Sequence, residues 1–433
     1  MKRAVPIALV FLLCSMFFSP GAALAGSKAV LNLPVLGANG LADDLYLYSC
    51  ADASCASPTQ LQDYGHITNV PRWPKGNGGP GGNPPAIWVF LNIAEQGYQY
   101  YQFWQNAGDC WKSCILGINA QGELDNSSTT CAGTVPIAPN GADGVASFTL
   151  GAAMFTNAQC GTPPAKMSQT NTLPLRSLTF INGASAKTIC LQTDSSFEHP
   201  QCTGDGANKI TSQTPYIINS SDLVNGSNSG VGQVSGFQLK DGDEWIDTGR
   251  EVPSDQVYAT NLEWTVWPQH TQHTMGPTTV DISLVNGFNV GATLTPDQDC
   301  VCSVADTEGG VPYFVLYKAG VPMAEFPKPE ASLSILCPQG SEAPISQDNK
   351  YGCYSSCSKA RYYESADQDQ LCCSGSYNTP ATCTDPPSRP YVQNVNNYST
   401  RVYSWAFNDW RGTFTCEPTA SFTFTVTDIE QTF

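Results

Sequence analysis

Two histidines present the clearest pattern for metal chemistry in the sequence. His270 and His273 form an H-x-x-H pair beside several acidic residues, and two imidazoles with one carboxylate can hold zinc when the backbone brings them together. Pro268, Gly276 and Pro277 surround the pair, which indicates a loop rather than a helix. We therefore interpret the histidines as part of a solvated turn, and we predict no metal and no other cofactor.

Cysteine chemistry is much better represented. The chain has 18 cysteines, which a reducing cytosol would leave as thiols and an exported protein can oxidise to disulfides. The first 25 residues fit a cleavable secretory signal, because a basic start and a long apolar run lead to Ala23-Leu24-Ala25. Loss of Cys14 with that signal would leave an odd number of cysteines. We predict a secreted protein, extracellular or periplasmic.

The composition argues against several other classes of protein. The formal net charge of -17 repels phosphate backbones, so we expect no nucleic-acid partner. After the signal, no stretch approaches the roughly 18 apolar residues of a membrane span. Esterase, nucleotide and dinucleotide motifs are also missing from the sequence. Only 13% of residues are charged, and Gly and Pro are frequent, which favours a turn-rich β fold with few helices.

The length indicates two domains, and residues 26–170 are expected to form the first. Short alternating runs near residues 45–48, 87–91 and 146–150 read as strands, and the loop of residues 71–85 is too rich in Pro and Gly for an inner strand. This region matches no family that we can name. We consider the pairs Cys50 with Cys55, Cys110 with Cys114, and Cys131 with Cys160, although spacing alone cannot fix the connectivity.

A polar, Pro-containing segment at residues 161–174 separates this region from a second domain, over 177–433. Within it, the polar stretch 203–232 reads as an insertion. Four segments resemble the thaumatin-like family: LTFINGASAKTIC from Leu178, GFQLKDGDEWIDT from Gly236, VDISLVNGFNVG from Val280, and VYSWAFNDWRGTFTC from Val402. The resemblance extends from Ser177 to Glu430. It implies a β-sandwich with a disulfide-rich loop subdomain at residues 337–383.

The same resemblance implies a set of disulfides. These are Cys300 with Cys416, Cys337 with Cys353, Cys357 with Cys372, and Cys373 with Cys383. The region around Ser399 lacks an expected cysteine, which would leave Cys302 without a partner. For Cys190 we consider Cys202 as the alternative partner. A reactive role for Cys302 would need a thiolate and a positioned base, and neither is evident.

Thaumatin-like domains and the related bacterial β-1,3-glucanases have an acidic cleft implicated in β-1,3-glucan recognition. By resemblance, Glu263 in NLEWTVW and Asp281 in VDISLVNGFNV occupy cleft positions. Hydrolysis of a glycosidic bond needs one carboxyl group to protonate the leaving oxygen and another to activate water or attack carbon. We assign Glu263 as the general acid and Asp281 as the base, with the inverting outcome of the related glucanases. The alternative is that both are solvated strand residues.

Two departures from the family pattern count against full catalysis. Asn286 stands where several relatives have an aspartate, and it can hydrogen-bond a sugar but cannot carry charge. Arg401 aligns with another family aspartate, and the family's cleft arginine has only Arg250 as a candidate match.

Aromatic residues near these acids offer candidate surfaces for sugar rings. Strand parity places Trp267 on the same side as Glu263 and Trp264 on the opposite side, so Trp267 is the better platform and Trp264 and Trp405 read as core. Phe288 and Trp410 are further candidates. We predict Glu263 and Asp281 as catalytic residues and Asn286, Phe288, Trp267 and Arg250 as substrate-binding residues.

The first functional hypothesis is a secreted protein that binds β-1,3-glucan in an acidic cleft, with hydrolysis left open. The second is a non-catalytic defence or interaction protein on the same scaffold that binds a cell wall or a protein. A third places the function in the N-terminal region, through its Gly/Pro loop and the aromatic run Tyr98 to Trp104.

Overall fold

The computed structural model describes the chain in segments separated by gaps. Several sequence predictions fall outside it: the signal, the two histidines, Trp267, Arg250 and Cys202. The described residues are 28–34, 45–63, 86–93, 96–106, 110–119, 121–137, 145–150, 152–155, 158–164, 176–183, 189–191, 209–210, 215–219, 230–235, 237–241, 244–246, 260–266, 278–307, 313–329, 331–344, 351–417 and 419–429.

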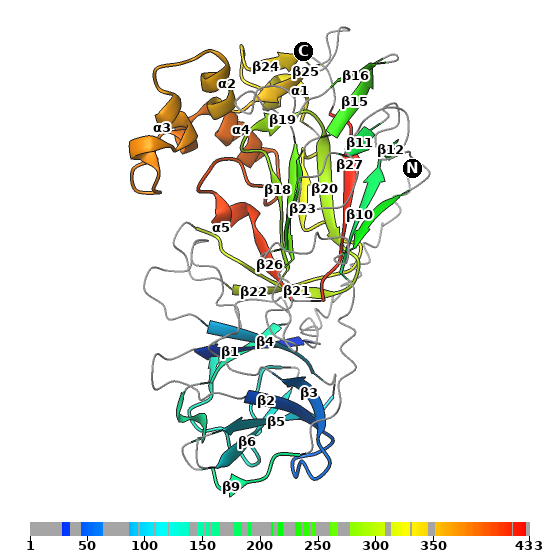
Figure 1. Cartoon of the computed structure of the whole chain (residues 1–433), viewed down its shortest axis with the longest axis vertical. Helices are drawn as coiled ribbons and strands as arrows, with labels where there is room; N and C mark the ends of the chain where they lie inside the picture. Colours follow the sequence, from blue (N-terminus) through cyan, green and yellow to red (C-terminus); the bar gives the residue numbers. More distant parts are fainter. Residues whose placement is uncertain are drawn as a thin grey trace, which may run out of the picture.

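The N-terminal region contains two β-sheets (Figure 1, lower part). The first has the order β4-β1-β8-β7 and the second the order β3-β2-β5-β6-β9. The strands are β1 (Lys28–Pro34), β2 (Leu45–Cys50), β3 (Thr59–Asp63), β4 (Ala86–Asn92), β5 (Tyr98–Asn106), β6 (Trp111–Asn119), β7 (Val135–Ile137), β8 (Val145–Thr149) and β9 (Cys160–Gly161). Strands therefore form where the alternating runs predict them, because alternate apolar side chains such as Leu31 and Phe103 are buried in one core.

The disulfides of this region differ from two of the three expected pairs. Cys50 pairs with Cys55 as expected. Cys110 pairs with Cys160, and Cys114 with Cys131, which corrects both of the other pairs. The reason is strand pairing: β6 begins beside β9, so Cys110 lies next to Cys160, whereas Cys114 is buried further along β6. These neighbours are far apart in sequence, so close spacing misled the expectation.

The C-terminal region is a β-sandwich. One sheet has the order β13-β10-β27-β20-β23 and the other the order β14-β17-β18-β26-β21-β22. The first contains β10 (Ser177–Asn182), β13 (Tyr216–Asn219), β20 (Gly291–Pro296), β23 (Ala324–Phe326) and β27 (Phe422–Thr427); the second contains β14 (Gly230–Ser235), β17 (Asn261–Val266), β18 (Thr278–Ser283), β21 (Cys300–Val304), β22 (Tyr313–Tyr317) and β26 (Phe414–Cys416). The predicted alternation of β27 is confirmed, because Phe422, Phe424 and Val426 are buried.

Strands that are distant in sequence close this sandwich. β10 runs parallel to β27, with Phe180 beside Phe424. The segment expected as an insertion supplies β13, which pairs with β10, and the start of β14, which pairs with β17. A smaller sheet has the order β12-β11-β15-β16, from β11 (Ile189–Leu191), β12 (Lys209–Ile210), β15 (Phe237–Asp241) and β16 (Glu244–Ile246).

A helical, disulfide-bonded part packs on one side of the sandwich (Figure 1, upper left). It contains α1 (Leu333–Leu336), α2 (Ser356–Tyr362), α3 (Gln368–Cys372), α4 (Pro390–Asn397) and the small sheet of β19 (Gly287–Phe288), β24 (Glu342–Pro344) and β25 (Tyr351–Tyr354); the short α5 (Asp409–Gly412) follows. Three bridges agree with those implied by resemblance: Cys337–Cys353, Cys357–Cys372 and Cys373–Cys383. The neighbours Cys372 and Cys373 can face different partners because Cys373 has a positive φ of 55°.

The fourth implied bridge is corrected. Cys302, not Cys300, pairs with Cys416. β21 lies beside β26 with Cys302 directly opposite Cys416, so the strand register selects the later cysteine. Cys300 stays a buried free thiol, with its Sγ 3.8 Å from that of Cys302.

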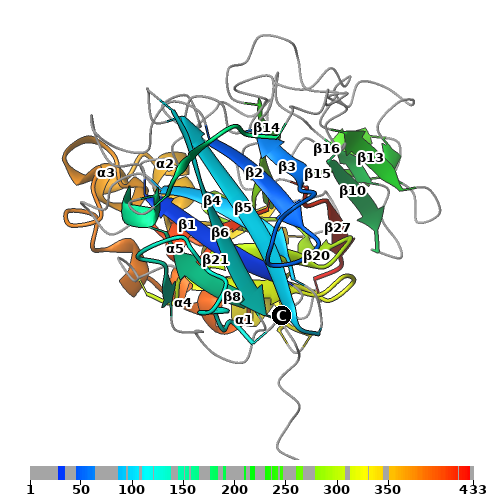
Figure 2. The same cartoon turned by 90° about the horizontal axis from the view of Figure 1, so that it is seen from below.

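The two regions contact each other through β-sheets (Figures 1 and 2). Val30 and Val145 of the N-terminal region are buried with Val301 of β21, and Phe90 meets Phe314 edge to face at 6.5 Å. An ion pair reinforces the contact: Lys28 Nζ lies 2.8 Å from a carboxylate oxygen of Glu417. Within the described residues, no helix is long and apolar enough to cross a membrane.

Candidate functional site

The strands β17 and β18 position the candidate acids. In antiparallel register Glu263 lies directly opposite Asp281, so both side chains project from the same face of the sheet. Their neighbours along the two strands, Trp264, Val280 and Ile282, are fully buried on the other face. Strict alternation thus sorts the apolar side chains into the core and the two acids onto the opposite, polar face. It also confirms that Trp264 is core.

A third acid joins this pair from a different element. Asp409 begins α5, which leads directly into β26 next to β18 (Figure 1). The end of α5 approaches the chain very closely: a Cβ on Gly412 would lie 2.4 Å from the backbone nitrogen of Tyr403, so only glycine fits there. This contact holds Asp409 close enough to interact electrostatically with both Glu263 and Asp281.

Burial raises the pKa of all three carboxyl groups, and neighbouring negative charge raises the pKa of Glu263 and Asp281 further. Burial is the main cause for Glu263, followed by the charge of Asp409, while a hydrogen bond from Ser283 acts in the opposite direction. The pKa of Asp281 is raised well above its ordinary value by burial, then by the charges of Glu263 and Asp409. Burial also raises the pKa of Asp409, and a hydrogen bond with Tyr403 opposes that shift. The cluster therefore holds protons to higher pH than isolated carboxyl groups.

The three acids differ in access to solvent. Asp281 is only 4% exposed, and its Oδ1 has no hydrogen-bond partner among the described residues, while Oδ2 accepts a bond from the Thr413 hydroxyl at 3.3 Å. Glu263 and Asp409 are partly exposed. A buried carboxylate with an unsatisfied oxygen is costly, so Asp281 is expected to be neutral. Glu263 and Asp409 are therefore the more exposed acids of the cluster.

Comparison with known proteins identifies the scaffold of this site. The thaumatin family model matches residues 251–428, which contain all three acids. Residues 251–428 form a thaumatin-like domain. The matched residues begin after β10 and β13 in the sequence. Both strands nevertheless belong to the same sandwich, because β10 pairs with β13 and with β27.

Curated relatives agree with the family match. The chain is 32% identical over 146 residues to a protein named glucan endo-1,3-beta-glucosidase from Prunus avium, covering 33% of this chain and 47% of that protein. It is 28% identical over 139 residues to thaumatin-like protein 1 of Pyrus pyrifolia (31% and 43%), and 29% identical over 136 residues to pathogenesis-related protein 5 of Arabidopsis thaliana (31% and 44%). The chain thus spans a little under half the length of these relatives.

The structure also locates the other predicted site residues of the thaumatin-like domain. Asn286 is half-buried, and its backbone carbonyl oxygen accepts a hydrogen bond from the Ser355 backbone N–H at 3.3 Å. Phe288 is wrong as a substrate contact, because it is fully buried and packs on Phe326 and Tyr391. Trp405 is only 7% exposed, as expected for a core residue.

Arg401 replaces a family aspartate and makes contacts of its own. Its guanidinium donates to the carbonyl oxygen of Ala305 at 3.0 Å, to Asp306 at 2.9 Å and to the Tyr313 hydroxyl at 2.8 Å. These partners belong to the β21–β22 connection and to β22. Arg401 is therefore committed to holding this connection, and it takes no acidic role in the cluster.

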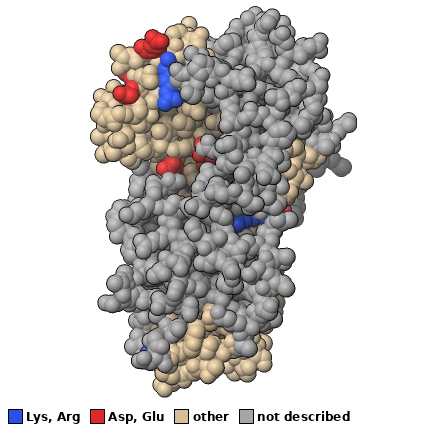
Figure 3. All heavy atoms as spheres, in the orientation of Figure 1, with Lys and Arg blue, Asp and Glu red and all other residues tan. Residues whose placement is uncertain are grey.

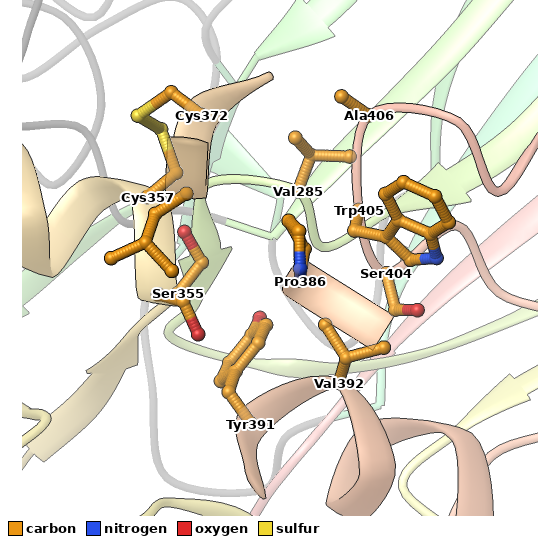
Figure 4. Close-up of a pocket in the computed structure, with 12 residues that line it drawn as sticks. Val285, Ser355, Cys357, Cys372, Pro386, Tyr391, Val392, Ser404, Trp405 and Ala406 are labelled. Atoms are coloured by element: carbon orange, nitrogen blue, oxygen red, sulfur yellow. A yellow bond between two sulfur atoms is a disulfide. The ribbon is translucent and has the colours of Figure 1, made fainter. Parts of the chain in front are cut away.

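A small cavity lies between the helical part and the sandwich (Figure 4). Its lining includes Val285, Ser355, Tyr391, Ser404 and Trp405, and its volume is about 20 Å³. Pockets for small molecules usually measure about 300–1,000 Å³, so this cavity fits water and is too small for a sugar ring.

Three cysteines lie close enough together to be considered as metal ligands, but two of them are joined in a disulfide. The sulfur atoms of Cys300, Cys302 and Cys416 lie within 4.8 Å of one another. Two of them form the Cys302–Cys416 disulfide, and burial raises the pKa of the Cys300 thiol, so the group offers no thiolate to a metal.

The described surface in Figure 3 is mostly uncharged, with a few Asp and Glu side chains visible on this face.

Asp409 is the site residue that sequence reasoning missed. It lies inside the quoted segment VYSWAFNDWRGTFTC, so its motif was visible. Its approach to Glu263 depends on the turn into α5 and on the tight Gly412 contact, which no spacing rule provides. The available signal was the position of Asp409 itself. It lies just before β26, and β26 pairs with β18, the strand that carries Asp281.

Proposed function

We propose that this is a secreted thaumatin-like protein that binds β-1,3-glucan and hydrolyses it at Glu263 and Asp409. The observation that supports this most directly is the group of three electrostatically interacting acids, in which Glu263 and Asp281 share the polar face of the sheet and Asp409 approaches from α5. The relative named as a glucan endo-1,3-beta-glucosidase suggests the substrate class. The seven disulfides among the described residues suit an oxidising, extracellular compartment.

The electrostatics divide the roles. We assign the ionised state to Asp409, whose pKa is lowered by a hydrogen bond with Tyr403 against the effect of burial, and the protonated state to Glu263, whose pKa is raised by the charge of Asp409. Glu263 is thus the general acid that protonates the leaving glycosidic oxygen, and Asp409 is the base that activates water. Asp281 cannot reach a polysaccharide, so it moves from the expected base to a neutral, positioning residue of the cluster.

The experiment that tests this function measures new reducing ends released from laminarin at mildly acidic pH. Wild type is expected to release them. Glu263→Gln and Asp409→Asn are each expected to reduce the rate by about 10²- to 10⁴-fold, the usual contribution of a general acid or base. The matched control is Asp299→Asn, which removes an acid that pairs with Lys318 at the surface, away from the cluster.

A second candidate function is non-catalytic glucan binding, and a specific observation favours it. Asn286 and Arg401 replace two family aspartates, and Arg401 is occupied by contacts to Ala305 and Asp306. If wild type releases no reducing ends but laminarin still retards it in affinity electrophoresis, the protein is a binding module and hydrolysis of this substrate is excluded. Absence of both effects would overturn the glucan proposal altogether.

A further inference from the structure

Three tyrosines of the helical part form a continuous aromatic group that leads from the protein interior to solvent. Tyr354, at the end of β25, is only 5% exposed, and its ring stacks on that of Tyr362 with centroids 5.3 Å apart and planes at 24°. Tyr362 in turn meets Tyr363 at right angles, with centroids 4.9 Å apart. Tyr362 is 44% exposed and Tyr363 62% exposed.

Packing does not account for the outer two rings. Tyr363 is the most exposed of the large hydrophobic side chains among the described residues, and its neighbour Tyr362, the last residue of α2, is also exposed. Burial of aromatic surface is where such side chains contribute most of their stabilisation, so two adjacent exposed rings point to a ligand.

The tyrosines are held on a rigid support. The Ser355 side chain caps the start of α2 by accepting a hydrogen bond from the Ser358 N–H at 3.0 Å. Within the helix, Cys357 is bonded to Cys372 of α3 (Figure 4). The inner ring of Tyr354 buttresses Tyr362 from below. A preformed surface of this kind loses little side-chain entropy when a ligand binds.

The support of the tyrosines is also joined to the strand that carries Asp281. β18 continues through Asn286 into β19, and β19 pairs with β25, so that Gly287 lies opposite Tyr354. The Ser355 N–H donates to the Asn286 carbonyl oxygen at the same point. The aromatic group therefore starts at the predicted sugar-binding residue Asn286 and extends away from it.

We propose that Tyr362 and Tyr363 form an additional binding platform, on which pyranose rings of a polysaccharide stack outside the acid cluster. A pyranose ring has an apolar C–H face that fits a flat aromatic ring, and the tyrosine hydroxyl groups stay available to hydrogen-bond sugar hydroxyls. The neighbouring charged residues Arg361 and Glu364 supply further donors and acceptors. The platform rests on the proposed glucan function and adds to it a preference for long chains over short oligosaccharides.

The experiment measures laminarin affinity by electrophoresis and, separately, cleavage of a short β-1,3-glucan oligosaccharide. The Tyr362→Ala, Tyr363→Ala double variant is expected to bind laminarin about tenfold more weakly and to cleave the short substrate at the wild-type rate. Tyr363→Ala alone, which removes the more exposed ring, is expected to lose part of that affinity. The matched control is Val321→Ala, which trims a 54% exposed apolar side chain of the same domain and is expected to bind as wild type does.

The outcomes separate the two proposals. If wild type binds laminarin and the folded double variant binds it equally well, the platform is wrong and the glucan function stands. If Val321→Ala weakens binding as much as the double variant, the loss is a general effect of trimming an exposed apolar side chain and the platform is also wrong. If wild type neither binds laminarin nor cleaves either substrate, the glucan function fails and the platform fails with it.

Discussion

Residue type and environment separate the three acids of the thaumatin-like domain. Sequence resemblance placed Glu263 and Asp281 in the cleft, and the register of β17 and β18 brings them side by side. Burial could not be read from the sequence, and it is burial that makes Asp281 inaccessible while Asp409 stays partly exposed. The same limit explains Phe288, whose motif looked like a binding residue until its packing was known.

The buried carboxyl of Asp281 predicts an unusual pH dependence of stability. Its pKa is higher in the folded than in the unfolded protein, so the folded state binds the extra proton and the free energy of unfolding falls as pH rises above the ordinary aspartate pKa. Asp281→Asn keeps a neutral side chain and the oxygen that accepts from Thr413. Relative to wild type, this variant is expected to gain thermal stability as pH rises above the ordinary aspartate pKa, until pH passes the raised pKa of Asp281 in the folded protein.

Thermal unfolding followed by circular dichroism at several pH values measures this difference. The gain corresponds to about 2–4 °C in Tm for each kcal/mol in a domain of this size. The account would be contradicted if Asp281→Asn were destabilised by a constant amount across the whole pH range. That result would indicate an ionised Asp281 with an unrecognised partner.

At the scale of elements, the face on which a strand residue lies can be predicted from the sequence, whereas the register between two strands cannot. Parity is local, so the sequence predicted that Trp264 is core and that Phe422, Phe424 and Val426 share a face. Register is set by distant strands, so the sequence could not choose between Cys300 and Cys302, which lie on the same face of β21. The β21–β26 pairing makes that choice by placing Cys302 opposite Cys416.

The register of β21 gives a direct prediction. The Cys302–Cys416 bridge closes a loop of 114 residues, and a loop of that length is worth about 4–5 kcal/mol in the chain-entropy model. Cys300→Ser is expected to keep the bridge and most of the stability. The Cys300→Ser, Cys302→Ser double variant is expected to lose both, with a Tm lower by about 10 °C or more.

Thermal unfolding and non-reducing peptide mapping of both variants check the pairing. The double variant is needed because Cys302→Ser alone would leave Cys300 close enough to Cys416 to replace it. Loss of the cross-link in Cys300→Ser would show that the earlier cysteine is the native partner, as the resemblance had implied.

At the scale of the whole molecule, the N-terminal sheets contact the thaumatin-like domain at β21 and β22. The contact is an apolar cluster around Val301, and Lys28 pairs with Glu417, whose carboxylate also accepts from the Val301 N–H at 3.2 Å. Composition predicted two disulfide-bonded β regions but gave no sign of this contact, since its residues lie hundreds of positions apart. It joins the two regions on the strand that also carries the Cys302 bridge.

The central claim is that a protonated Glu263 and an ionised Asp409 act together on a glucan. The most direct measurement is the pH dependence of kcat/KM for laminarin with the wild-type protein. The account predicts a bell-shaped profile with its maximum at mildly acidic pH, rising as Asp409 ionises and falling as Glu263 loses its proton. A profile that rises to a plateau with no descending limb at higher pH would contradict it, because loss of the Glu263 proton would then not limit hydrolysis.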